Sequence, residues 1–286
     1  MNTLHIVADS SMDMPADWQK EYEIEILPIN IQFGEKSYQQ GVNLDHHQFY
    51  RMVRELKMIP KTSLPSPAQI ADYYRSIARR GESILSMHVA SKMSGTYQAV
   101  LLAAKDLVSE FDLHPFDSGN GSAGLAYMCK EARLLQRAGH SLDDILRRME
   151  FIRRKVTIVL TLDNLEFARM SGRVSMITQK LSSLLQVKPV ILLKDGMLDI
   201  ADRVRTRNRS IERVIELVKQ KVGKKLVNIA IVHAEDLTVA AEMLNKVRDA
   251  FRINELITTD LSISVAANLG PGTVGIIAYP VMEGEE

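Results

Sequence analysis

Short hydrophobic runs, each ending in polar residues and followed by a helical pattern, recur along the first half of the chain. Leu4–Ala8 is such a run, and it ends at Asp9-Ser10-Ser11. Buried strands of parallel sheets have this continuous hydrophobic character, whereas amphipathic helices repeat about every 3.6 residues. The alternation of strand, polar loop and helix predicts a mostly parallel sheet with helices on both faces. Further strands are expected at Ile24–Ile31, Ser83–Val89 and Leu113–Phe116, and helices at His46–Lys57, Ala68–Arg80 and Ala99–Val108.

The pattern changes at Val156, and a tight hairpin is indicated at Asp195-Gly196. Because domains usually contain roughly 100–200 residues, we expect two α/β domains, residues 1–155 and 156–286. The second domain is expected to contain strands at Thr157–Leu162, Lys188–Leu193, Leu226–His233, Glu255–Thr259 and Ile276–Pro280, and helices at Leu165–Met170, Lys180–Leu185, Arg209–Val222 and Thr238–Phe251.

Hydroxyl side chains cluster in two predicted loops that follow strands. The carboxyl ends of parallel strands meet at one edge of a sheet, where ligands of open α/β sheets bind. Hydroxyls and the N–H groups of a helix N-terminus together form a neutral site for an anion such as carboxylate or phosphate. Gly95 would let a ligand approach the backbone closely. The alternative is that Ser94 and Thr96 simply cap a helix. The hydroxyl residues are Thr62, Ser63 and Ser66 in one loop and Ser91, Ser94 and Thr96 in the other.

The spacing of residues gives less support to a serine nucleophile or to a metal site. Ser94 lies in Met93-Ser94-Gly95 rather than in a Gly-x-Ser-x-Gly elbow, and no histidine is spaced as its base. An enzyme acting on a small phosphorylated or carboxylated substrate stays open as the alternative, with Ser94 or an aspartate as the reactive group. Asp9, Asp117 and Asp260 follow strands and could hold Mg²⁺, although capping a turn is the commoner role.

Two further segments have alternative interpretations. Gly270-Pro271-Gly272 precedes a strand rather than a helix, so dinucleotide binding is not favoured, and its glycines instead suit a loop packed closely against the site. No Gly-x-x-x-x-Gly-Lys-Ser/Thr motif occurs, which excludes a P-loop NTPase. Arg203, Arg205, Arg207 and Arg209 form either a solvated helix entry or a docking point for an anionic partner.

Composition narrows the classes of function. The 286 residues include 36 basic and 35 acidic side chains, a net charge of +1, which does not favour nucleic acid as a partner. A single cysteine, Cys129, fits a reducing compartment and is interpreted as a small buried apolar residue. The N-terminus lacks a signal-peptide pattern, and no apolar run approaches the ~20 residues of a membrane span. We therefore expect a cytoplasmic protein.

Several motifs in this order resemble the DegV family. The chain opens with Val7-Ala8-Asp9-Ser10-Ser11, and Asp117-Ser118 is similar to the end of the family's third strand. Thr62-Ser63-Leu64-Pro65-Ser66 is similar to the family's Thr-Ser-Gln-Pro-Ser loop, and Ser94-Gly95-Thr96 to its Ser-Gly-Thr loop. The resemblance continues over almost the whole chain through Gly41-Val42, Phe49-Tyr50, Leu165-Glu166, Gly172-Arg173-Val174-Ser175, Lys188-Pro189-Val190, Val204-Arg205-Thr206 and Gly270-Pro271-Gly272.

The resemblance implies a two-domain α/β protein that binds one long-chain fatty acid, with the ligand site at the C-terminal edge of the strands and at the domain interface. It implies carboxylate contacts from Thr62 and Ser94, with Ser63 and the Gly95 backbone beside them. No catalytic residue, metal or cofactor is implied. Such proteins present the acyl carboxylate to a separate ATP-dependent fatty-acid kinase, which makes acyl-phosphate for phospholipid metabolism. Arg205 would correspond to an arginine needed for work with that kinase.

Two positions depart from the family pattern. Leu64 stands where the family usually has glutamine. Asn268 stands where kinase-associated members carry a histidine two residues before Gly-Pro-Gly. The amide of Asn268 can still donate a hydrogen bond to a carboxylate, but it cannot titrate. The departure therefore bears on the kinase partnership more than on fatty-acid binding.

Overall fold

The computed structural model describes residues 3–175 and 187–282, so the predicted helix at Lys180–Leu185 lies outside the described residues. The chain divides into two compact units, and each unit is assembled from separate stretches of sequence. The boundary between residues 155 and 156 stays a prediction. Unit 1 contains Met1–Asp45, Thr62–Arg154 and Ser262–Ser264, and unit 2 contains His46–Lys61, Lys155–Leu261 and Val265–Glu286.

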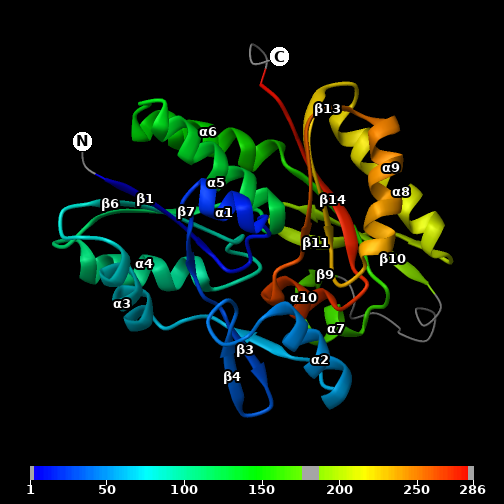
Figure 1. The fold of residues 1–286 in the computed structure, drawn as a ribbon, viewed down its shortest axis with the longest axis horizontal. Coiled ribbons are helices and arrows are strands. Elements are labelled where there is room, and N and C mark those ends of the chain that lie inside the picture. The colour runs from blue at the N-terminus through cyan, green and yellow to red at the C-terminus, as the bar shows by residue number, and fades with distance from the viewer. Residues whose placement is uncertain (1–2, 176–186, 283–286) are drawn as a thin grey trace. The chain divides into compact units, whose positions relative to one another are not determined.

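Unit 1 is built around a parallel four-stranded sheet, as the strand–loop–helix alternation predicted. The strand order is β2-β1-β6-β7, and every neighbouring pair is parallel. Connections between parallel neighbours run through helices, which cover both faces of the sheet (Figure 1). The strands are β1 (Leu4–Asp9), β2 (Glu25–Leu27), β6 (Ser83–His88) and β7 (Asp112–Asp117), and the helices are α1 (Ala16–Glu21), α3 (Pro67–Ile77), α4 (Thr96–Leu107), α5 (Ser122–Arg137) and α6 (Leu142–Lys155).

The hydrophobic runs are explained by this double coverage. Val7 of β1 and Ile84 of β6 pack with Ile70, Tyr74 and Val100 against α3 and α4. Because side chains alternate along a strand, the neighbours of these residues point to the opposite face, where α5 lies (Figure 1). Both faces are therefore shielded from water, and β1 is buried at nearly every position.

A second, smaller sheet corrects two predictions. The expected strand Ile24–Ile31 is interrupted at Pro28 and contributes to two different sheets. The segment around Thr62 was expected to be entirely loop because it contains three prolines, but those prolines flank residues 61–63, which are free to pair as a strand. The small sheet has the order β4-β3-β5 and consists of β3 (Asn30–Phe33), β4 (Lys36–Gln39) and β5 (Lys61–Ser63).

Residues 262–264 belong to unit 1 through hydrogen bonds to its loops. The Ser262 N–H donates to Asp13 Oδ1 at 2.7 Å, and the Ile263 N–H donates to Gln40 Oε1 at 2.8 Å. Ser264 Oγ donates to the Ser10 carbonyl oxygen at 2.9 Å. Asp13 is buried, so its carboxylate needs such donors, and they fix this short segment against the loop that follows β1.

Unit 2 contains a seven-stranded mixed sheet of order β13-β12-β14-β8-β10-β11-β9, in which β12 pairs in parallel with β13 and β11 with β9. Helices α8 and α9 cover a core of valine, isoleucine and methionine side chains on this sheet. The elements are β8 (Thr157–Thr161), β9 (Val174–Ser175), β10 (Lys188–Lys194), β11 (Met197–Val204), β12 (Leu226–His233), β13 (Arg252–Asp260), β14 (Val274–Pro280), α2 (His46–Leu56), α7 (Glu166–Ser171), α8 (Arg207–Val222) and α9 (Leu237–Ala250). Helix α10 (Ile263–Leu269) has its first two residues in unit 1 and the rest in unit 2.

The predicted hairpin at Asp195-Gly196 is confirmed. It joins the antiparallel strands β10 and β11, and its two residues have φ values of +50° and +77°. Positive φ at both central positions defines the type I′ turn that suits twisted antiparallel strands. Within the described ranges, no helix is long and apolar enough to cross a membrane.

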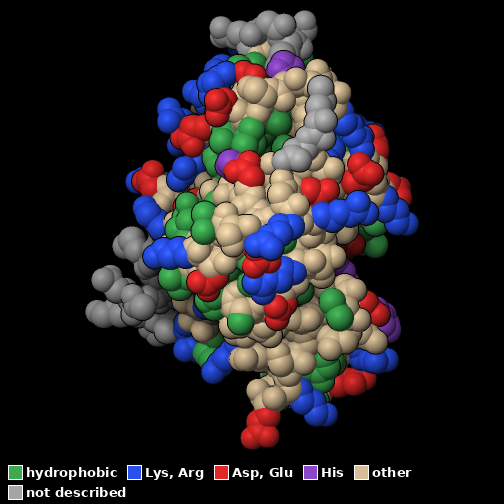
Figure 2. Space-filling model, turned by 90° about the vertical axis from the view of Figure 1, so that its left-hand side faces the viewer, with side chains coloured by type: hydrophobic (Ala, Val, Ile, Leu, Met, Phe, Trp, Pro, Cys, Tyr) green, Lys and Arg blue, Asp and Glu red, His purple; other side chains and the backbone are tan. Residues whose placement is uncertain are grey.

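Charges of both signs are interspersed on the face drawn in Figure 2, without a continuous basic field. Exposed ion pairs in the described residues include that of Arg75 with Glu110, at 2.8 Å. This face therefore agrees with the balanced composition of the whole chain.

Candidate functional site

The segment that carries Ser94 begins where β6 ends, and neighbouring loops hold its backbone. The N–H of Val89 donates to Asp9 Oδ2 at 2.9 Å, and the N–H of Ala90 donates to the Asn120 carbonyl oxygen at 2.7 Å. The N–H of Ser91 donates to Asp117 Oδ1 at 3.1 Å. Consecutive amide groups are thus tied to the ends of β1 and β7, so the path of the segment toward Ser94 is fixed.

Ser94 forms a local turn with the first residue of α4. Its Oγ accepts a hydrogen bond from the Thr96 N–H at 3.3 Å and lies 2.9 Å from Thr96 Oγ1. The N-cap position of α4 is Gly95, and no side chain caps it. Gly95 rather than Ser94 therefore occupies the N-cap position, while Ser94 Oγ still satisfies the N–H of the first residue of the helix. Ser94 remains partly exposed, whereas Thr96 is buried.

The second hydroxyl segment lies against the first. A Cβ atom added to Gly95 would lie 3.2 Å from Leu64 Cδ2, so the two segments touch at this point. Thr62 and Ser63 are both partly exposed, and Ser63 Oγ accepts a hydrogen bond from Gln32 Nε2 at 3.2 Å. The two segments therefore lie next to each other at Leu64 and Gly95, although β5 belongs to the small sheet rather than to the parallel one.

Ser66 has a different role from its neighbours. It is the N-cap of α3 in a capping box, in which its Oγ accepts from the Gln69 N–H and Gln69 Oε1 accepts from the Ser66 N–H. Such reciprocal hydrogen bonds satisfy donors that a helix terminus leaves unpaired. Ser66 therefore belongs to the folding of α3 and not to the candidate site.

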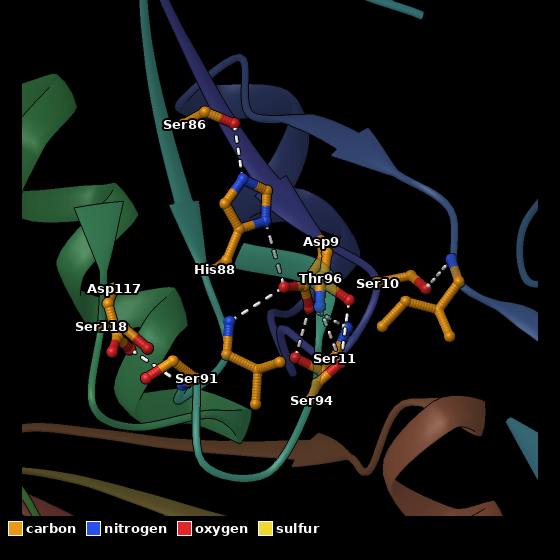
Figure 3. A network of polar contacts seen from close by, with 12 residues as sticks. Asp9, Ser10, Ser11, Ser86, His88, Ser91, Ser94, Thr96, Asp117 and Ser118 are labelled. Atoms are coloured by element: carbon orange, nitrogen blue, oxygen red, sulfur yellow. Dashed lines mark hydrogen bonds and ion pairs between the residues drawn. The ribbon is translucent and has the colours of Figure 1, made fainter. Parts of the chain in front are cut away.

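A buried aspartate connects the loops behind Ser94 (Figure 3). Asp9 accepts hydrogen bonds from the N–H and Oγ of Ser11 and from the Val89 N–H, and it pairs with His88 Nδ1 at 3.2 Å. Burial raises the pKa of the Asp9 carboxyl. The hydrogen bond and charge of His88, with the donors of Ser11 and Val89, outweigh that effect, so this pKa lies below its ordinary value.

The network continues through the core of unit 1. His88 Nε2 lies 2.8 Å from Ser86 Oγ, which lies 2.6 Å from the Tyr74 hydroxyl. Serine, histidine and aspartate in this order resemble a hydrolase triad, but Ser86 is fully buried and no substrate can reach it. This network was not predicted from the sequence. The available signal was that Asp9 and His88 each stand at the end of a hydrophobic run that was predicted to form a strand.

The aspartates considered for Mg²⁺ have other partners. Asp117 accepts hydrogen bonds from the N–H groups of Ser91 and Gly119, which is the turn-capping role. Asp260 of unit 2 lies 3.4 Å from His233 Nδ1. No group of three or more histidine, cysteine, aspartate or glutamate side chains that could hold a metal ion occurs in the described part of the chain.

Asn268 lies in unit 2, near the end of α10, and is partly exposed. The backbone carbonyl oxygen of Asn268 accepts a hydrogen bond from Ser171 Oγ at 3.2 Å. The glycine loop that follows packs closely against α7, because a Cβ atom on Gly270 would lie 2.8 Å from the Phe167 ring. Gly270 also has a φ of +88°, so glycine is required there for two reasons.

The arginine run of unit 2 divides into paired and exposed members. Arg207 pairs with Asp236 at 3.0 Å, and Arg209 pairs with Glu212 at 3.1 Å. Arg203 and Arg205 are exposed and have no ion-pair partner among the residues that the structure describes. Arg205 lies in the short connection between β11 and α8. The helix-entry interpretation therefore suits Arg207 and Arg209, while Arg203 and Arg205 remain available to a partner.

Comparisons with known proteins agree with this architecture. Residues 3–281 match the model of a family described as "Uncharacterised protein, DegV family". The chain belongs to the DegV family. Protein DegV of Bacillus subtilis is 27% identical over 273 residues, which cover 95% of this chain and 97% of that protein.

Solved structures of DegV proteins share the fold. A DegV family protein from Thermus thermophilus, whose structure is described as fatty-acid binding, is 28% identical with a TM-score of 0.87 and covers 98% of this chain and 100% of its own. The structure of DegV from Bacillus subtilis, described as a fatty-acid-binding protein, is 25% identical with the same TM-score of 0.87, and it covers 98% of this chain and 100% of its own.

Proposed function

We propose that this DegV family protein binds one long-chain fatty acid and holds its carboxylate on hydroxyl and backbone donors of unit 1. The donors are the hydroxyls of Thr62, Ser63 and Ser94 and the backbone of Gly95. The observation that carries the proposal is the contact at Leu64 and Gly95, which brings the two hydroxyl segments together. The fatty-acid-binding descriptions of the relatives from Thermus thermophilus and Bacillus subtilis support the nature of the ligand.

The acyl chain and the carboxylate of such a ligand contribute differently to the binding free energy. Each methylene group removed from water contributes roughly 0.8 kcal/mol, so the acyl chain supplies most of the affinity. The carboxylate has to be satisfied, because an unpaired buried charge is very costly. Neutral hydroxyl and amide donors are sufficient for that task, and they fix the orientation of the head group.

Ser94 does not have the partners of a nucleophile. Among the described residues its Oγ hydrogen-bonds only with Thr96, and neither a histidine nor a carboxylate lies within hydrogen-bonding distance of it. A nucleophilic serine needs an adjacent general base that removes its proton. The proposal is therefore a carrier, in which catalysis belongs to a separate ATP-dependent kinase that converts the bound acid to acyl-phosphate in the cytoplasm.

Two residues of unit 2 complete the proposal. Asn268 is proposed as a further ligand-binding residue, because its side-chain amide can donate to a carboxylate without titrating. Arg205 is proposed as a contact for the kinase, because it is exposed and has no ion-pair partner among the described residues. A guanidinium group suits recognition of phosphate or carboxylate groups on a partner.

Ligand binding is tested by extracting the purified protein with organic solvent and by native mass spectrometry. We expect one bound acid of roughly C14–C18, because chains of that length gain on the order of 10 kcal/mol from burial. The double variant Thr62→Ala with Ser94→Ala should lose the acid and keep its circular dichroism spectrum. Ser109→Ala, at an exposed position beyond α4, is the control and should retain it. A protein that neither carries nor binds a fatty acid would contradict the proposal.

The kinase partnership is tested separately. With a purified fatty-acid kinase subunit and ATP, the loaded protein should support acyl-phosphate formation, and Arg205→Ala should reduce the rate while leaving fatty-acid affinity unchanged. Arg209→Ala is the matched control, because that guanidinium is already paired with Glu212 and Glu216. Equal rates for the two variants would exclude the assigned role of Arg205.

A further inference from the structure

Thr96 is a buried residue whose hydroxyl has a single partner. Its side chain is fully inaccessible to solvent, and Ser94 Oγ, at 2.9 Å, is its only hydrogen-bonding partner among the described residues. Ser94 Oγ also accepts the Thr96 N–H at 3.3 Å. The two hydroxyls can in principle be arranged in either direction, since each has one proton to donate and two lone pairs that accept.

Burial decides the direction. If Ser94 donated its proton to Thr96, the hydroxyl proton of Thr96 would be enclosed in the protein without an acceptor. A buried donor without a partner is costly, whereas a donor at an accessible position finds water or a ligand. Thr96 therefore donates to Ser94, and the partly exposed Ser94 keeps its own proton for an acceptor outside the turn.

This direction decides whether Ser94 acts as a donor or as an acceptor toward a ligand. Its oxygen accepts from both the N–H and the hydroxyl of Thr96, so its lone pairs are occupied and only its proton is available. Hydrogen bonds that an oxygen accepts also strengthen its own O–H as a donor. Ser94 then interacts best with an acceptor-only, negatively charged group, which describes a carboxylate and not an alcohol.

We infer that Thr96 is the specificity-determining residue that makes Ser94 a donor and so selects a carboxylate over an uncharged head group. The inference rests on the proposed function and adds a residue that does not itself touch the ligand. Thr96 acts through Ser94, which makes it a positioning residue. Threonine allows a specific test of this role, because valine has nearly the same shape but no hydroxyl.

The test compares the affinities of delipidated protein for palmitic acid and 1-hexadecanol by isothermal titration calorimetry. Losing one hydrogen bond to Ser94 should lower the ratio of the two affinities roughly two- to tenfold in Thr96→Val. Thr96→Ser restores the hydroxyl and should keep the ratio of the unmodified protein. A change that only loosened the fold would weaken both lipids alike and leave the ratio unchanged. Thr96→Ala removes the same hydroxyl and replaces the valine variant where that one does not fold.

A double-mutant cycle shows whether Thr96 acts through Ser94. Ser94→Ala should lower the ratio, and Thr96→Val should lower it no further in that background. An unchanged ratio in Thr96→Val, or an equal loss with and without Ser94, would overturn the inference while fatty-acid binding stood. Failure of the unmodified protein to bind palmitic acid would instead overturn the proposed function.

Discussion

Replacing Asp9 by asparagine should destabilise unit 1 strongly. The side chains are almost the same size, but the amide has no charge and one of its terminal groups can only donate. Asp9 is fully buried and accepts from Ser11, Val89 and His88. Removing one partner of a buried ion pair costs roughly 3–5 kcal/mol, because the remaining group stays in an environment of low polarity.

The effect can be measured in unit 1 specifically. Trp18, on α1, is the only tryptophan of the chain, and its ring packs edge-on against Tyr127 with centroids 5.9 Å apart. Its fluorescence during urea unfolding therefore follows unit 1, and the midpoint and slope give the free energy of unfolding. Asp112→Asn is the control, because this mostly exposed aspartate should contribute less than ~1 kcal/mol.

The pH dependence adds a second criterion. Because the pKa of Asp9 is lower in the folded protein than its ordinary value of about 3.9, the carboxylate stabilises the fold above that pH. This contribution is lost as the pH falls through the folded-state pKa. The difference in unfolding free energy between the unmodified protein and Asp9→Asn should therefore be constant near neutral pH and shrink below about pH 4. A difference under 1 kcal/mol at pH 7, or one that grew in acid, would refute the reasoning.

Three further predictions use local features of the fold. Gly270→Ala should lower the free energy of unfolding by at least about 2 kcal/mol and move the urea midpoint to a lower concentration, because it adds left-handed strain and a clash with Phe167. Gly139→Ala is the control and should lower it less, because Gly139 has a φ of +82° but open space around it. Ser66→Ala should lower stability by about 1 kcal/mol in the same assay through loss of the α3 cap, and an unchanged midpoint would contradict that. Burial raises the pKa of the Cys129 thiol, so a thiol reagent should react with it only after unfolding, and rapid labelling of the native protein would show otherwise.

The parallel sheet of unit 1 could be predicted because its strands carry a strong local signal. β1 and β6 are buried on both faces, so they appear in the sequence as hydrophobic runs followed by polar residues. The position of Thr62 was harder to predict. Whether residues 61–63 form a loop or a strand depends on pairing with β3, about 30 residues away in sequence, and prolines on both sides obscured that signal.

The polar network behind Ser94 could not be predicted from local sequence. Asp9 and His88 are separated by 79 positions, and they meet only because β1 and β6 are neighbours in the sheet. The hydroxyl residues themselves were recognisable by type and spacing. The direction of the hydrogen bond between Ser94 and Thr96 required knowledge of which hydroxyl is buried, and that is a property of the packed protein.

The charges near the hydroxyl segment are arranged in a way that agrees with the proposed carrier function. The Asp9 carboxylate is paired with His88 and accepts backbone N–H donors, and Asp117 accepts the N–H of Ser91. Both carboxylates therefore stabilise the segment that carries Ser94, and neither of them hydrogen-bonds to Ser94 Oγ. In the described residues, Ser94 is hydrogen-bonded to a neutral residue and not to a cation. A guanidinium group would add an opposite charge and a second, parallel hydrogen bond, so an arginine would hold a carboxylate more tightly than a hydroxyl does and release it more slowly. In the proposed function, such neutral donors would leave the affinity largely to the acyl chain and keep the carboxylate exchangeable.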